Sequence, residues 1–128
     1  IYPEGDEYNR RTVYRFSPRG GRSAILDTFD CPDPSTTAPR RAVTTTPLQA
    51  LALLNNHFIL NKAGAMADRV ASHAKGNLDE QVKQIFLDAF QRQPDAEELR
   101  LAKRLAGEYG LVTLSRSLFN SNEFVILN

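Results

Sequence analysis

The pattern of apolar and polar residues changes near residue 46. Beyond that point apolar residues recur at spacings of three and four, which indicates amphipathic helices, whereas residues 1–45 show no sustained period. Proline, glycine, asparagine and aspartate divide the periodic part into five segments, so we expect five helices there. Because the connections between them are short, neighbouring helices are expected to be antiparallel. The sequence therefore predicts a mainly α-helical fold, with about five helices in an antiparallel, bundle-like array.

Cap residues mark where these helices begin and end. Thr46 and Pro47 are typical of the N-cap and first helical positions, and Gln49 can complete a capping box. The other expected limits are Asn56, Asn77 and Asp95 as N-caps, Gly76 and Gly110 as stops, and Val112 to about Asn122 as the range of the fifth helix.

The helix that starts at Pro47 is apolar on almost every side. Its apolar residues are Leu48, Ala50, Leu51, Ala52, Leu53 and Leu54. A helix without a polar stripe is expected to be buried all round. We therefore expect this helix to be the central one of the array.

Residues 1–45 are expected to form an irregular wrap that is rich in arginine and proline. Two stretches in it have the character of short strands, Thr12 to Phe16 and Ala24 to Phe29. We expect this wrap and a helical domain of residues 46–128 to form a single domain. Since the chain begins at Ile1 rather than Met, we expect that domain to be part of a larger one.

Composition narrows the class of protein. Apolar and charged fractions of 41% and 24% are those of an ordinary globular protein, and a net charge of +1 predicts no strong attraction to nucleic acid or to an anionic membrane. No apolar run reaches the roughly 18 residues that a membrane span needs. The single cysteine, Cys31, cannot form an internal disulfide or a cysteine-based metal site. We expect neither a nucleic-acid partner nor a membrane span.

Three carboxylates recur at every third position, at Asp27, Asp30 and Asp33. Carboxylate oxygens are the ligands that Ca²⁺ prefers, but the loop of an EF-hand needs acidic residues at every second position and a glycine at the sixth. A turn in which these aspartates pair with arginines is the favoured interpretation. We expect no metal site.

Arginines are concentrated in the same part of the chain. Five lie between positions 10 and 22, at Arg10, Arg11, Arg15, Arg19 and Arg22, and Arg40 and Arg41 follow. They could bind phosphate or sulfate, but seven positive and six negative residues leave residues 1–45 with a charge of only +1. We therefore expect Arg40 or Arg41 to pair with one of the three aspartates or to bind backbone carbonyls of the wrap.

No catalytic motif is present. His57 and His73 lie too far apart in sequence for a two-histidine zinc motif, and Cys31 precedes a proline rather than a helix N-terminus. The "PRGGRS" stretch lacks the Gly-Lys-Ser/Thr ending of a phosphate-binding loop. We expect no catalytic residue of a recognised type.

Five stretches together resemble one known family in order and spacing: "RRTVYRF", "LDTFDCPD", "RRAVTTTPLQALALLNN", "DAFQRQPDAEEL" and "LFNSNEFVILN". The chain resembles the C-terminal part of the PSD-one domain, a domain of unknown function in large planctomycete proteins. The resemblance covers nearly the whole chain, and its specificity lies in the combination of these stretches. The chain departs from the usual pattern in three places: Thr45 stands where Asn is common, Asn56 where Asp is common, and the pair Ser17-Pro18 where an aromatic and a basic residue are common.

The resemblance implies an exported protein, either periplasmic or on the cell surface, that often carries a cytochrome-c-like domain. Haem would then lie on an upstream domain, because this chain contains no Cys-x-x-Cys-His motif. We expect no cofactor in this chain, and the expected partners are upstream segments of the same protein, a polysaccharide or another secreted protein.

Two functional hypotheses remain open. The favoured one is a non-catalytic helical module that closes a larger extracytoplasmic protein and contributes to a surface for a protein or a polysaccharide. The alternative is half of a composite hydrolase-type or glycan-processing site formed by Asp30, Asp33, Arg40 and Arg41. Whether the protein is an enzyme is left open by the sequence.

Overall fold

The computed structural model describes residues 9, 11–14, 21, 23–33, 36–40 and 42–126, and all structural statements below concern these residues. The chain divides into two compact units, Ile1–Ala52 and Leu53–Asn128. The boundary between the units falls within a helix, α2 (Pro47–Asn55), and thus later than the change of pattern near residue 46.

The first unit contains a 3₁₀-helix η2 (Thr12–Tyr14), a short helix α1 (Ala24–Thr28) and the first part of α2. The described residues contain no strand, so the expectation of strands at Thr12 to Phe16 and Ala24 to Phe29 was wrong where the structure describes them. Short apolar runs are ambiguous between helix and strand. Ser23 at the N-cap position and Asp27 in the first turn are local signals that favour the helix.

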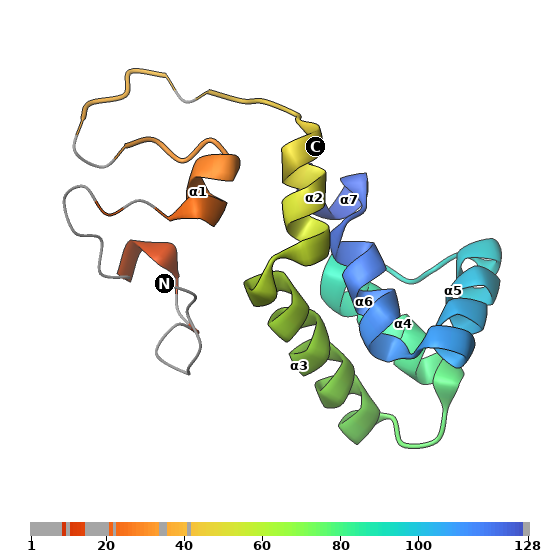
Figure 1. The fold of residues 1–128 in the computed structure, drawn as a ribbon. Coiled ribbons are helices and arrows are strands. Elements are labelled where there is room, and N and C mark those ends of the chain that lie inside the picture. Colours follow the sequence, from red (N-terminus) through yellow and green to blue (C-terminus); the bar gives the residue numbers. More distant parts are fainter. Residues whose placement is uncertain are drawn as a thin grey trace. The chain divides into compact units, whose positions relative to one another are not determined.

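The second unit contains the remaining helices. They are α3 (His57–His73), α4 (Leu78–Phe90), α5 (Ala96–Tyr109), α6 (Leu111–Phe119) and α7 (Asn122–Val125). The mainly α-helical fold is confirmed, as are all five helices expected between Pro47 and Asn122 (Figure 1). The short helix α7 was not expected. No described helix has the length and apolar character needed to cross a membrane.

The caps explain why these helices begin where the sequence predicts. At the start of α2, Gln49 N donates to Thr46 Oγ1 at 3.3 Å and Thr46 N donates to Gln49 Oε1 at 3.2 Å, which completes the expected capping box. Asp95 and Glu98 form a second capping box at the start of α5. The side chains of Asn56 and Asn77 cap α3 and α4.

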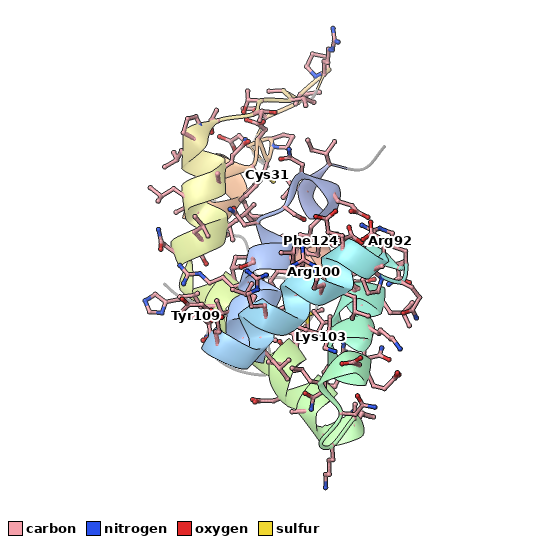
Figure 2. The ribbon with its side chains drawn as sticks, turned by 90° about the vertical axis from the view of Figure 1, so that its right-hand side faces the viewer. Cys31, Arg92, Arg100, Lys103, Tyr109 and Phe124 are labelled. Carbon is pink, nitrogen blue, oxygen red and sulfur yellow. The ribbon has the colours of Figure 1, made fainter. Side chains whose placement is uncertain are left out.

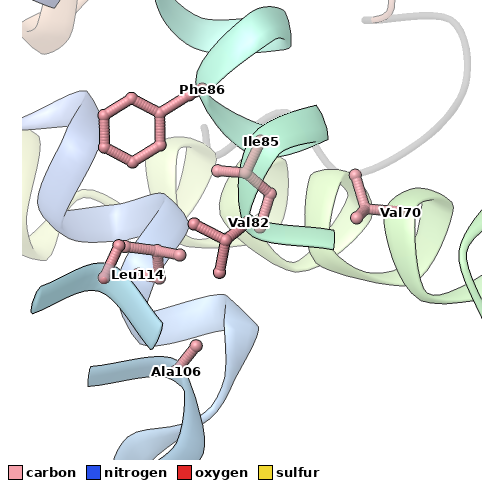
Figure 3. Packing of buried hydrophobic residues seen from close by; sticks show 7 residues of the cluster. Val70, Val82, Ile85, Phe86, Ala106 and Leu114 are labelled. Atoms are coloured by element: carbon pink, nitrogen blue, oxygen red, sulfur yellow. The ribbon is translucent and has the colours of Figure 1, made fainter. Parts of the chain in front are cut away.

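The hydrophobic core of the second unit lies between α3, α4, α5 and α6. Its buried members are Val70, Val82, Ile85, Phe86, Ala102, Ala106 and Leu114 (Figure 3). Phe90 packs edge-on against Phe86, with ring centroids 5.5 Å apart and an interplanar angle of 84°. These side chains come from helices that are consecutive in the chain, as the pattern predicts.

The central helix is α6 and not α2, which corrects the expectation from sequence. Helix α6 packs against α3, α4, α5 and α7, and its Leu114 and Ser115 are buried. In α2, by contrast, Leu48 is 61% and Leu51 is 55% exposed. Apolar residues on all sides of a helix indicate that its surface is buried in the complete protein. They do not indicate that residues of this chain bury it.

Candidate functional site

The candidate site residue Asp30 lies directly after α1, in a left-handed conformation with a φ of 57°. The backbone N–H of Cys31 donates to the carbonyl oxygen of Leu26 at 3.0 Å and closes the turn. Asp30 Oδ2 then accepts two hydrogen bonds from Thr44, from its N–H at 2.7 Å and from its hydroxyl at 2.8 Å. The Asp30 carboxylate therefore joins the end of α1 to the segment that leads into α2.

Gln49 extends this contact into a network that we call the Gln49 network, comprising Thr28, Asp30, Thr44, Thr46 and Gln49. Gln49 Nε2 donates to the carbonyl oxygen of Thr28 and to the hydroxyl of Thr44, both at 3.0 Å. The Gln49 side chain thus uses both amide hydrogens and its oxygen, and the residue is only 8% exposed. Buried polar groups that are satisfied in this way fix a single local structure.

The other candidate residues are placed differently. Arg40 is exposed and forms no hydrogen bond or ion pair with a described residue, so in this part of the chain the expected pairing of Arg40 with an aspartate is not seen. Asp33 is half-buried and has an interaction partner, and Arg41 lies outside the described residues. No three His, Cys, Asp or Glu side chains in the described ranges come together as a metal site. Among the described residues, the hydrogen-bond partner of Asp30 is Thr44 and not an arginine.

A second polar cluster, which the sequence did not indicate, surrounds Arg92 in the loop between α4 and α5. Its guanidinium donates to both carboxylate oxygens of Glu98, at 2.7 and 2.8 Å, and to both of Glu123, at 2.6 and 2.8 Å. A fifth bond, at 3.1 Å, goes to the carbonyl oxygen of Gln93. All five N–H groups of the guanidinium are therefore used. Figure 2 shows Arg92 close to Phe124, the residue that follows Glu123 in the chain.

The charges of this cluster are strongly coupled. Hydrogen bonds from Arg92, together with the backbone N–H of Asp95, lower the pKa of Glu98 to about 2. The same guanidinium lowers the pKa of Glu123. The pKa of Arg92 is raised in turn by its hydrogen bonds to Glu98, which have the larger effect, and to Glu123. The Arg92 guanidinium also lies over the rings of Phe86 and Phe90, at 5.9 and 5.5 Å from their centroids. Such saturation suits a structural clamp better than a catalytic group, because no donor remains for a substrate.

One local signal could have pointed to Arg92. It is the only charged residue between the end of α4 and the Asp95–Glu98 capping box, so its guanidinium is within reach of a carboxylate that the cap already fixes. Glu123 carries no such signal, because it is 31 residues away in sequence.

The fold and these polar clusters define an all-α module whose described carboxylate clusters hold the chain together. The chain belongs to the PSD1 family, proteins of unknown function (DUF1553), whose sequence profile matches residues 2–106. The resemblance to the PSD-one domain is thereby confirmed. No curated protein and no solved structure matches the chain.

Proposed function

We propose that this chain is a non-catalytic helical module of a larger extracytoplasmic protein, and that α2 packs against another segment of that protein. The observation that carries the proposal is the exposure of two leucines one turn apart on α2, Leu48 at 61% and Leu51 at 55%. Val43, just before the helix, is 90% exposed. Apolar side chains grouped in this way are typical of a surface that is covered in the complete protein.

The chemistry of α2 favours an apolar protein segment over a polysaccharide as its cover. No lysine, arginine, aspartate or glutamate occurs from Ala42 to Asn61. Protein interfaces have cores that are depleted of charge. The capping box and the Gln49 network fix the start of α2, so that its leucines are presented from a rigid helix rather than from a loop.

The alternative, a composite active site, has less support. Asp30 would have to act as an acid, a base or a sugar-binding group, but both of its observed hydrogen bonds hold Thr44. Asp30 Oδ2 thus connects two segments of the chain, which is a structural task rather than a catalytic one. Location outside the cytoplasm rests on the family resemblance alone.

The proposal is tested by hydroxyl-radical footprinting of the complete protein and of the 128-residue chain. Leu48 and Leu51 are expected to be labelled several-fold less in the complete protein, because the neighbouring segment covers them. Leu101 of α5, which is 48% exposed, serves as the matched reference and is expected to be labelled equally in both. Equal labelling of Leu48 and Leu51 in the two proteins overturns the proposal.

A further inference from the structure

Among the described residues, helix α7 is held to the rest of the second unit by few interactions. It has four residues and none of them is buried. Ser121 caps it, with Ser121 Oγ accepting from Phe124 N at 3.4 Å, and Phe124 stacks on Phe119 with ring centroids 4.8 Å apart. A further link is the pair of hydrogen bonds from Arg92 to Glu123. A segment with so few buried contacts lies at the low end of local stability.

The Arg92 clamp can lose Glu123 without leaving an unpaired charge. When Glu123 leaves, the guanidinium keeps both bonds to Glu98 and its bond to the Gln93 carbonyl. Two carboxylates share one guanidinium, so the negative charge of Glu98 opposes the binding of Glu123. Both arrangements of Arg92 are thus electrostatically satisfied, which is the condition for an element with two states.

We propose that α7 is a releasable strap, which the Arg92–Glu123 pair holds closed over Phe119 and which high ionic strength opens. Phe119 is only 8% exposed while Phe124 stacks on it. Opening separates the two rings and exposes an aromatic face at the end of α6. The core between α3, α4, α5 and α6 stays intact, because none of its buried members comes from α7. This device is independent of α2 and of the function proposed for it.

The test follows amide hydrogen exchange of Phe124, Val125 and Ile126, whose N–H groups donate within this segment. Glu123→Gln keeps the shape of the side chain and removes its charge, and it is expected to speed exchange of these amides roughly two- to fivefold, the factor expected from an exposed ion pair. In the wild type, raising salt from about 0.1 M to about 1 M shortens the screening length from about 10 Å to about 3 Å and is expected to have the same effect.

Glu108→Gln provides the matched control, because Glu108 is exposed on α5 and its substitution removes the same charge elsewhere. This control is expected to leave exchange in α7 unchanged, and Glu123→Gln is expected to abolish the response to salt. The proposal is overturned if α7 exchanges equally in Glu123→Gln and wild type. It is also overturned if the amides of α4, α5 and α6 lose protection together with α7, because the strap would then not open separately.

Discussion

The side chain of Arg116 binds the backbone of Leu54 near the end of α2. Its Nε donates to the Leu54 carbonyl oxygen at 2.7 Å, and its Nη2 donates to Asn55 Oδ1 at 3.3 Å. The last carbonyls of a helix have no partner within the helix. An arginine on α6 therefore supplies the partner that the end of α2 lacks.

Replacing Arg116 should destabilise the chain. Arg116→Ala removes a charge-assisted hydrogen bond to a partly buried carbonyl, and we expect a loss of about 1 to 3 kcal/mol in the free energy of unfolding. Urea denaturation of the variant and wild type measures this loss. Arg104→Ala, at an exposed position on α5, is the control and should change stability by no more than about 0.5 kcal/mol. If the two variants have equal midpoints, the contact with Leu54 is not stabilising.

The second prediction follows from the finding that α6, and not α2, is the central helix. Leu114 is 2% exposed, so Leu114→Ala should cost about 2 to 5 kcal/mol, the range for removing buried leucine methyl groups. Leu51 is 55% exposed, and Leu51→Ala should stay within about 0.5 kcal/mol in this chain. Chemical denaturation of both variants measures the two losses in the free energy of unfolding. A larger loss for Leu51→Ala would restore α2 as the central helix.

Acid should weaken the Arg92 cluster in a defined range. The folded pKa of Glu98 is about 2, below its ordinary value of about 4.5, so its contribution is fully present above pH 4.5 and is lost as the pH falls toward 2. Glu98→Gln should therefore lower the melting temperature at neutral pH, and the difference from wild type should shrink as the pH falls toward 2. Calorimetry at several pH values measures this convergence. A difference that does not change with pH would show that the charge of Glu98 is not what stabilises the fold.

The Gln49 network can be tested by removing its centre. Gln49→Ala leaves the Thr28 carbonyl, the Thr44 hydroxyl and the Thr46 N–H without their present partner, and we expect a cost of about 1 to 3 kcal/mol. The amide of Thr44, which Asp30 binds, should also exchange faster. Thr45→Ala changes an exposed neighbour and serves as the control. If the amide of Thr44 exchanges at the same rate in Gln49→Ala and wild type, the hydrogen bond between Thr44 and Asp30 does not depend on Gln49.

Local features were predictable from the sequence, and distant partners were not. Thr46 with Gln49 and Asp95 with Glu98 lie three residues apart, so spacing alone identifies the caps. The pairing of Asp30 with Thr44 depends on the left-handed backbone at Asp30, which no pattern of residues displays. Glu123 reaches Arg92 only because α5 and α6 reverse the chain between them.

The place of α6 in the chain has a consequence for synthesis. Ribosomes deliver a chain from its N-terminus, so Val70, Val82 and Ile85 emerge before Leu114. Until then the apolar faces of α3, α4 and α5 lack the helix that packs against all three. The second unit should therefore complete its fold late, with a nascent intermediate that is open to chaperones, proteases or an early association with other parts of the polypeptide.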